Sequence, residues 1–367
     1  MLLKFFRLSL CLIALFGGQA AAQVRAPKYS NEFLNIGVGG RALGMGNVQA
    51  AIARDATAGY WNPAGLLDLP RKNNVALMHS ELFAGIVKND YAAFAMPLDT
   101  ASALAVSLIR TGVDDIADTR NLVNEYGYIN YDNIRLFSVA DYALLLSYAR
   151  KSRLIKGLRL GANAKIIYRN VGDFANAYGF GIDAGAQLQR KNWRFGLMGR
   201  DITTTFNGWV HNPEAFRETA VVNGDSLLIK SSVEITLPRL VAGVARVISF
   251  SDKIGALLAA DLDLTFDGER NVLLRTGLVS VDPHLGLELY YDRLVYLRAG
   301  LNNLQQIKNF DDTQSWRVQP NFGVGIATNG FTLDLALSRI ADTTPTNNFS
   351  SNGNLSSVIV SLGYSFD

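Results

Sequence analysis

The chain has 367 residues, of which 49% are hydrophobic and only 18% are charged, with one cysteine and three histidines. This composition excludes a disordered chain, which would be charged and poor in apolar residues, and it excludes a disulfide-rich scaffold. Beyond the first 22 residues no run of about 18 apolar residues occurs, which excludes a helical membrane protein as well.

The first 22 residues have the pattern of a secretory signal peptide. Lys4 and Arg7 form a positive region, residues 8–16 form an apolar core, and Ala20, Ala21 and Ala22 provide a cleavage site of the A-x-A type. A membrane anchor is the alternative, but the core is too short to span about 30 Å of hydrocarbon. The rest of the chain keeps 33 of the 35 basic residues against 32 acidic ones, and this near-neutral balance gives no reason to expect a nucleic acid partner.

Residues 23–72 differ from everything that follows them. The stretch 33–69 is rich in glycine and alanine and has no sustained alternation of apolar and polar residues. Its glycines allow close approach of one backbone to another. We therefore expect residues 23–72 to form a separate, compact segment.

From residue 73 onward, apolar residues occupy every second position of segments about ten residues long. In residues 255–266, for example, Asp261, Asp263 and Thr265 lie on the face opposite a row of alanine, leucine and phenylalanine. The polar face of these segments is dominated by small residues and asparagine, whereas a soluble sandwich carries a denser mixture of charges there. The pattern indicates a barrel with lipid outside and a tight or watery interior.

About fourteen such segments can be counted, and bacterial barrels of one chain require an even number. They are residues 73–82, 90–98, 101–110, 142–151, 157–170, 179–189, 193–202, 238–249, 254–266, 284–291, 294–302, 321–328, 331–339 and 357–366. Residues 271–279 are ambiguous. The predicted fold is all-β: a transmembrane antiparallel β-barrel over residues 73–367.

The connections alternate between short and long. Residues 99–100, 190–192, 292–293 and 329–330 form short links, and Asn329-Gly330 is a typical hairpin turn. The long links are residues 111–141, 203–237, 267–283, 303–320 and 340–356. A transmembrane barrel carries tight periplasmic turns on one rim and longer external loops on the other, so both termini are expected on the periplasmic side.

The last segment alternates almost to the end of the chain. Val358, Val360, Leu362, Tyr364 and Phe366 share one face, which places two aromatic rings where a membrane interface favours them. The final strand of a soluble sheet is the alternative interpretation.

No catalytic constellation is present. His79, His211 and His284 are far apart in the sequence and do not form H-x-x-x-H, and G-x-S-x-G is absent. We therefore expect no enzyme activity, no metal and no cofactor. The rare charged residues of the strands are expected to pair inside the barrel if they face it, because unpaired buried charge is costly. They are Lys165, Asp183, Asp261, Asp263, Glu288, Arg298 and Asp334.

The stretch 37–46, followed by Asp55-Ala56-Thr57 and Tyr60-Trp61-Asn62-Pro63-Ala64-Gly65, resembles the N-terminal region of the PorV/PorQ family of outer-membrane proteins. That family is built like the long-chain fatty-acid transporter barrel. The resemblance implies that residues 23–72 form a plug inside a 14-stranded barrel. It also implies that Asn62, Pro63, Ala64 and Gly65 anchor the plug to the wall, while a simple Asx-Pro turn is the alternative.

The resemblance further implies a role in type IX protein secretion, in which the barrel binds or shuttles cargo bearing a C-terminal signal. It would dock on translocon or surface-attachment proteins. The long loops 111–141 and 203–237 would make the contacts, with Trp209 and Phe216 as candidate anchors. The alternative function is a transporter of hydrophobic molecules, with the plug as gate and a kinked strand as lateral exit. An outer-membrane enzyme is disfavoured by the missing motifs.

Overall fold

The computed structural model describes residues 29–124, 126–212, 215, 221–222, 225–226, 231–308, 314–339, 341–342 and 356–367. The predicted signal peptide, residues 1–22, lies outside the described residues. Within them, no helix has both the length and the apolar character needed to cross a membrane.

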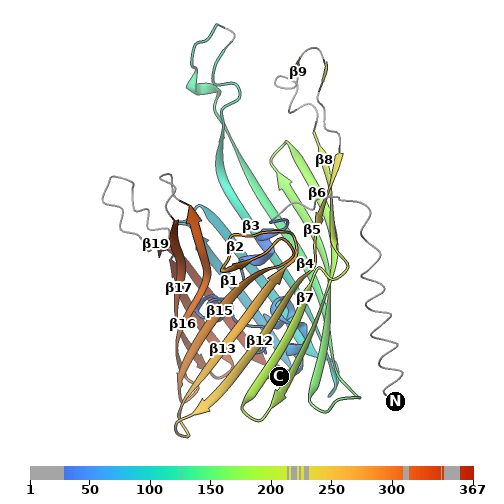
Figure 1. The fold of residues 1–367 in the computed structure, drawn as a ribbon, viewed down its shortest axis with the longest axis vertical. Coiled ribbons are helices and arrows are strands. Elements are labelled where there is room, and N and C mark those ends of the chain that lie inside the picture. The colour runs from blue at the N-terminus through green and yellow to red at the C-terminus, as the bar shows by residue number, and fades with distance from the viewer. Residues whose placement is uncertain are drawn as a thin grey trace.

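The described residues form a closed antiparallel barrel (Figure 1). Its wall consists of β1 (Asn73–Leu82), β2 (Val87–Pro97), β3 (Ser102–Asp118), β4 (Arg135–Lys151), β5 (Leu158–Val171), β6 (Ala175–Arg190), β7 (Trp193–Arg200), β8 (Thr205–His211), β11 (Ser231–Thr236), β12 (Arg239–Ser249), β13 (Ile254–Thr265), β15 (Ser280–Tyr291), β16 (Val295–Lys308), β17 (Gln314–Thr328), β18 (Phe331–Arg339) and β20 (Ser356–Phe366). Because β7 continues into β8 and β11 continues into β12, these pieces make fourteen wall strands in the part of the chain that the structure describes. Pairing of β1 with β20 closes the barrel. The predicted fold and strand number are confirmed.

Four strands of two residues each complete the sheet structure of the described residues. β9 (Val221–Val222) pairs with β10 (Asp225–Ser226). β14 (Leu274–Arg275) pairs with β15, and β19 (Ala341–Asp342) pairs with β17. The ambiguous residues 271–279 therefore contribute only β14, and the even number of wall strands is kept.

The alternation of the sequence matches the two faces of the wall. On β13, Leu258 and Leu262 are 46% and 48% exposed on the outer face, whereas Asp261 and Asp263 are 2% and 5% exposed on the inner face. Apolar side chains outside and polar side chains inside are what a barrel in lipid requires, because lipid cannot satisfy polar groups.

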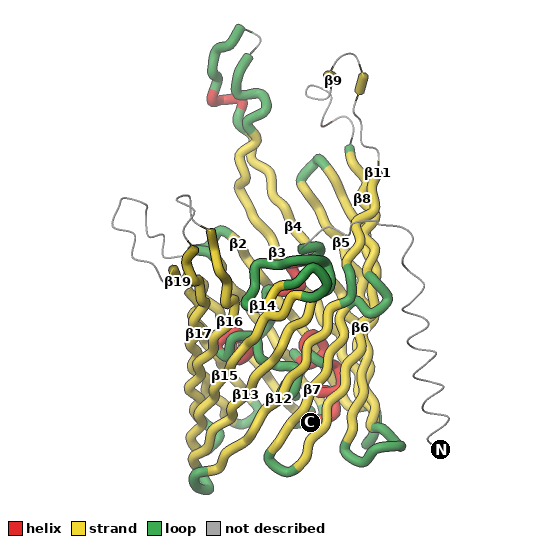
Figure 2. Tube along the Cα trace, viewed as in Figure 1, coloured by secondary structure: helices red, strands yellow, loops and turns green. Residues whose placement is uncertain are grey.

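The two ends of the barrel differ (Figure 2). At the short-turn end, which includes residues 98–101 and 329–330, tight turns join the strands; Asn329 and Gly330 have φ of 47° and 86°, as a type I′ hairpin turn requires. At the opposite, long-loop end lie residues 119–134 and 266–279. Two connections at that end, residues 83–86 and 172–174, are nevertheless short.

All five predicted long loops contain strand residues, so their predicted bounds are wrong. β14 and the start of β15 lie in 267–283, parts of β16 and β17 lie in 303–320, and β19 and the start of β20 lie in 340–356. In 111–141, β3 continues to Asp118 and β4 begins at Arg135, so a hairpin projects beyond the wall and carries η3 (Tyr131–Asn133) near its tip (Figure 1). Both faces of this hairpin are partly exposed, so its sequence is not required to alternate between apolar and polar residues. In 203–237, β8 and β11 continue the wall.

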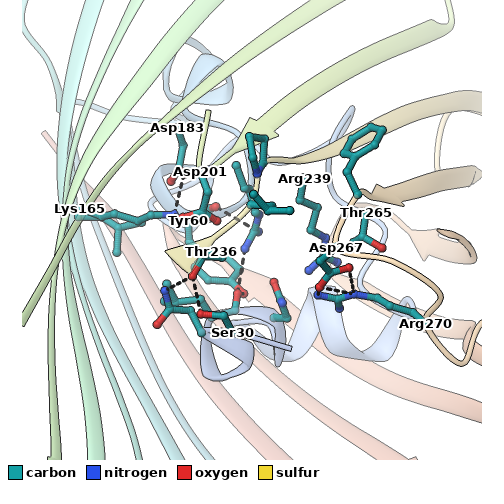
Figure 3. Close-up of a pocket in the computed structure, with 18 residues that line it drawn as sticks. Ser30, Tyr60, Lys165, Asp183, Asp201, Thr236, Arg239, Thr265, Asp267 and Arg270 are labelled. Carbon is teal, nitrogen blue, oxygen red and sulfur yellow. Dashed lines mark hydrogen bonds and ion pairs between the residues drawn. The ribbon is translucent and has the colours of Figure 1, made fainter. Parts of the chain in front are cut away.

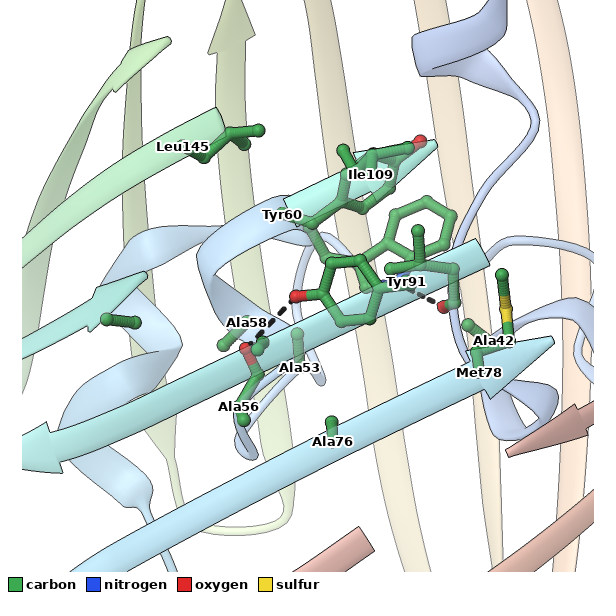
Figure 4. Packing of buried hydrophobic residues seen from close by; sticks show 14 of the residues in the cluster. Ala42, Ala53, Ala56, Ala58, Tyr60, Ala76, Met78, Tyr91, Ile109 and Leu145 are labelled. Carbon is green, nitrogen blue, oxygen red and sulfur yellow. Dashed lines mark hydrogen bonds between the residues drawn. The ribbon is translucent and has the colours of Figure 1, made fainter. Parts of the chain in front are cut away.

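The N-terminal segment, residues 29–72, packs inside the barrel. It contains η1 (Glu32–Asn35), α2 (Gly40–Gly44), α3 (Ala58–Trp61) and η2 (Pro63–Asp68). Such short helices are not stable alone and depend on packing. The main apolar core lies between this segment and the inner face of β1 to β5, where Tyr60 packs edge-on against Tyr91 with ring centroids 6.4 Å apart (Figure 4).

Candidate functional site

Glycines in the wall let the N-terminal segment lie directly against it. A Cβ added to Gly196 of β7 would lie 2.0 Å from the carbonyl oxygen of Ala50, and one on Gly300 of β16 would lie 2.1 Å from the amide nitrogen of Gly46. Such contacts occur on opposite parts of the strand order, from β5 to β7 and from β15 to β17. The segment therefore fills the barrel at the level of these glycines.

Asn62 binds the segment to the wall. Its side chain is fully buried, and its Nδ2 donates to the carbonyl oxygens of Ala50 at 2.8 Å and of Ala186 on β6 at 3.1 Å. Its Oδ1 accepts the Ala64 N–H at 3.2 Å and caps η2, which begins at Pro63. A Cβ on Gly185 of β6 would lie 2.1 Å from that Oδ1. The lack of a side chain at Gly185 therefore leaves room for the buried Asn62 amide.

The other residues of the predicted anchor lie in the same contact. A Cβ on Gly161 of β5 would lie 2.5 Å from the Ala64 amide nitrogen and 2.9 Å from the Pro63 side chain. A Cβ on Gly65 would lie 2.0 Å from the Ala53 carbonyl oxygen. The four residues therefore sit together, and the anchoring role itself stays a prediction that substitution can test.

Charged side chains of the strands pair inside the barrel, as expected. Arg298 contacts Glu288 at 2.7 Å and Asp334 at 2.6 Å, and Arg41 of α2 contacts Glu288 at 2.8 Å. Since Arg41 belongs to the N-terminal segment, this network also ties the segment to β15. Asp261 differs, because it accepts the N–H groups of Gln49 and Ala50 at 2.8 and 2.9 Å instead of pairing with a cation.

The wall is interrupted at one level on two neighbouring strands. Between β7 and β8, residues 201–204 leave the regular pairing, and between β11 and β12 Leu237 and Pro238 do the same. We call this interruption, residues 201–204 and 237–238, the wall break. Proline has no N–H to donate to a paired strand, so Pro238 is the one sequence signal for the wall break.

A buried ionic cluster holds the wall break (Figure 3). Lys165 Nζ lies 2.8 Å from Asp183 Oδ1 and 2.6 Å from Asp201 Oδ1, and the Asp201 N–H donates to Asp183 Oδ1 at 2.8 Å. The Lys165 and Asp183 side chains are only 3% and 5% exposed. Lys165 approaches Thr205 across Gly181, where a Cβ would lie 2.7 Å from Lys165 Cε.

Residues 30–36, which we call the strap, cover the inner side of the wall break. Asn31 donates to Thr236 Oγ1 of β11 at 2.7 Å and accepts from Asn207 Nδ2 of β8 at 2.9 Å. Arg200, the last residue of β7, donates to the Leu34 carbonyl oxygen at 2.9 Å. The strap therefore contacts both interrupted strands.

Three cavities lie along the strap. The largest, which we call the vestibule, has a volume of about 360 Å³ and faces the long-loop end. Two smaller cavities, of about 40 and 30 Å³, share lining residues with the vestibule, and the smallest reaches Leu237 and Pro238 at the wall break. Asn35 and Arg239 line all three. The cavities thus form a series from the vestibule to the wall break, divided by Arg239, which pairs with Asp263.

The predicted loop position of Trp209 is wrong, because this residue lies on β8. Its indole N–H donates to Glu234 Oε2 at 2.8 Å, and the Arg169 guanidinium lies 5.1 Å from its ring centroid. Its role in partner binding stays a prediction. Phe216 lies outside the described residues.

The projecting hairpin carries exposed aromatic residues near its tip. Tyr126, Tyr128 and Tyr131 are 82%, 72% and 71% exposed. Asn124 Oδ1 accepts the N–H groups of Tyr126 and Tyr128 at 3.0 and 2.9 Å. Below the tip, the hydrogen bond from Arg120 lowers the pKa of Asp118 to about 2.

Within the described residues, no group of three or more histidine, cysteine, aspartate or glutamate side chains could hold a metal ion. His284 uses its Nδ1 in a 2.8 Å contact with the Gly46 carbonyl oxygen, and His79 lies 2.6 Å from Asp90 on the outer face.

No protein-family model and no curated protein matches the sequence. Solved structures do match. They include the CymD monoaromatic hydrocarbon channel (TM-score 0.56, 14% identity, covering 90% of this chain and 98% of that chain). A toluene transporter of Pseudomonas putida, TodX, matches with a TM-score of 0.56 at 12% identity over 90% of this chain and 99% of that one. A FadL homologue of Pseudomonas aeruginosa matches with a TM-score of 0.50 at 12% identity over 90% and 98%.

These identities establish the fold alone. The chain has the FadL-like fold, a closed 14-stranded antiparallel β-barrel with a short helical N-terminal segment. The matched proteins are transport channels and FadL relatives, not enzymes. Membership of the PorV/PorQ family stays a prediction.

Proposed function

We propose that the chain is an outer-membrane channel for hydrophobic molecules. The observation that carries this proposal is the series of cavities that begins at the vestibule and ends at the wall break, past Asn35 and Arg239. A wall break in a membrane barrel faces the bilayer, so an apolar molecule can leave sideways into lipid. In this proposal the long-loop end is external and both termini are periplasmic.

The packing of the N-terminal segment favours a sideways route over a straight one. The segment meets the wall backbone to backbone at Gly196 and Gly300, and clearing a straight pore would require the loss of these contacts together with the bonds of Asn62. Opening the wall break requires movement of the strap and rearrangement of the ionic cluster at Lys165, and it leaves these backbone contacts in place. The strap is held by side-chain hydrogen bonds, each of which contributes about 1 kcal/mol, by the 2.7 Å ion pair of Glu32 with Arg270, and by the burial of Phe33 and Leu34.

The matched proteins support the same proposal. Two of them are described as a monoaromatic hydrocarbon channel and a toluene transporter, and they share the barrel over 90% of this chain. Since the identities are 14% and 12%, this support concerns the architecture and not the binding residues.

The test is uptake of radiolabelled toluene by cells that lack their own hydrophobic-uptake barrels. Cells expressing this chain should take up toluene several-fold faster than cells expressing an unrelated barrel of similar size. Equal rates in the two strains would contradict the channel proposal.

A second candidate function, a component of type IX protein secretion, is favoured by the hairpin tip. Exposed tyrosine side chains have few rotatable bonds, so they lose little conformational entropy on binding and are common interface anchors. The proposed partners are translocon or surface-attachment proteins and signal-bearing cargo. Replacement of Tyr126, Tyr128 and Tyr131 by alanine should abolish co-purification of such partners in mild detergent, and a deletion strain that exports and anchors its cargo normally would contradict this role.

A further inference from the structure

The vestibule has two chemically different sides. Ile36 and Leu43 of the N-terminal segment, together with Leu82 and Phe83 at the end of β1, form an apolar side. The other side carries neutral amides and hydroxyls from β16, β17, β18 and β20. These residues are Asn302, Asn303, Gln305, Gln319, Asn321, Ser338 and Ser357. The volume of this cavity falls in the range of small-molecule sites, and most of its lining is polar, so a ligand would meet many hydrogen-bonding groups and one apolar surface.

A β-bulge gathers the amides. The pairing of β16 with β17 shifts between Asn302 and Gln305, and Asn303 has a φ of 51°. Bulges redirect side chains and are common beside functional sites. Asn303 and Ser338 both bond to the Gln319 side chain, and Asn321 Nδ2 donates to Asn302 Oδ1 at 2.8 Å. The result is a pre-organised row of neutral hydrogen-bonding groups.

The cations that line the vestibule already have partners. Arg270 contacts Glu32 at 2.7 Å and Asp267 at 2.6 Å, and Arg239 pairs with Asp263. Asp282 adds a further carboxylate to the lining. A ligand carboxylate would therefore meet acidic side chains without a free cation, and burying such a charge is strongly unfavourable. A hydroxyl group, which can both donate and accept, suits the amide row.

We propose that the vestibule binds uncharged amphiphiles that carry a hydroxyl group on an apolar body, and that it rejects carboxylates. The hydroxyl contacts the amide row, and the body packs on the apolar side. The inference rests on the proposed function in one respect: it names the chemical class of molecule that the channel admits.

The test uses three probes that share a methyl-substituted benzene ring and differ in the para substituent: toluene, p-cresol and 4-methylbenzoate. Binding of each to the purified full-length barrel is measured by equilibrium dialysis at pH 7, where p-cresol is neutral and 4-methylbenzoate is ionised. We expect p-cresol to bind about tenfold more tightly than either other probe, the factor expected for one or two hydrogen bonds. Equal binding of all three, or preferred binding of 4-methylbenzoate, would overturn the proposal.

Variants identify the groups responsible. Gln319→Met with Ser338→Ala should remove the preference for p-cresol and leave toluene binding unchanged. The matched control is Asn176→Leu, which removes an amide of β6 that does not line the vestibule and should keep the preference. If Asn176→Leu lost the preference for p-cresol while the double variant kept it, the assignment of the preference to the amide row would be overturned.

A gain of binding provides a test that misfolding cannot imitate. Asp263→Asn leaves Arg239 without its carboxylate partner, so this variant should bind 4-methylbenzoate about tenfold more tightly than the unaltered chain does. An unchanged affinity would contradict the charge argument. Failure of the channel proposal is seen separately: toluene uptake without a p-cresol preference overturns only the inference, and p-cresol binding without uptake overturns only the channel.

Discussion

Removal of the Asn62 side chain should release the N-terminal segment from the wall while the barrel stays folded. Asn62→Ala removes three short hydrogen bonds, two donated at 2.8 and 3.1 Å and one accepted at 3.2 Å, besides a longer contact of 3.4 Å to the Leu197 carbonyl oxygen. At about 1 kcal/mol for each bond, the segment loses about 3 kcal/mol of its attachment. Since each 1.4 kcal/mol is tenfold in an equilibrium constant, the segment should open about 100-fold more often.

Hydrogen exchange on the detergent-solubilised barrel measures this opening. Amides of residues 50–65 should exchange about 100-fold faster in Asn62→Ala, while amides of β13 and β15 should keep their protection. Asn176→Ala, in which an amide outside this contact is removed, should leave both sets unchanged. Unaltered exchange of residues 50–65 in Asn62→Ala would refute the anchoring role.

Three further outcomes follow from single contacts. Gly196→Val places side-chain atoms against a backbone carbonyl that cannot move aside, so it should expose the N-terminal segment to protease; full protection would contradict the close approach. Lys165→Met leaves buried carboxylates unpaired and should cost about 3–5 kcal/mol in heat-induced unfolding, and adding Asp183→Asn should recover most of that loss. Arg120 lowers the pKa of Asp118 to about 2, so the pair stabilises the hairpin fully above the unfolded pKa of about 3.9, and this stabilisation is lost as the pH falls toward 2. An NMR titration midpoint of the Asp118 carboxyl near 3.9 would exclude the ion pair.

The wall could be predicted from the sequence because lipid and lumen act on each residue locally. Every second residue of a strand such as β13 faces lipid, and this requirement appears directly in the alternation from Leu258 to Phe266. The hairpin beyond the wall has water on both faces, so nothing forces residues 111–118 to alternate, and the sequence pattern ended too early. Trp209 was misplaced for a related reason, since the wall break interrupts the pattern just before β8.

The candidate site depends on contacts between residues that are far apart in the chain. Asn62 bonds to Ala186, and Asn31 contacts Asn207 and Thr236, so no local pattern reveals these pairs. The lumenal charges could be predicted as a class, because ionisable residues on an otherwise apolar or small-residue strand must find partners. Which cation meets which carboxylate is decided by register and by the N-terminal segment.

The central claim, lateral exit through the wall break under control of the strap, is tested most directly by locking the strap. Ser30 Oγ lies 2.6 Å from Thr236 Oγ1, so Ser30→Cys with Thr236→Cys brings two sulfur atoms within bonding reach. The only natural cysteine, Cys11, belongs to the predicted signal peptide. The oxidised variant should lose toluene uptake and regain it on reduction, with each single variant as a control. Unchanged uptake in the fully oxidised barrel would contradict the account.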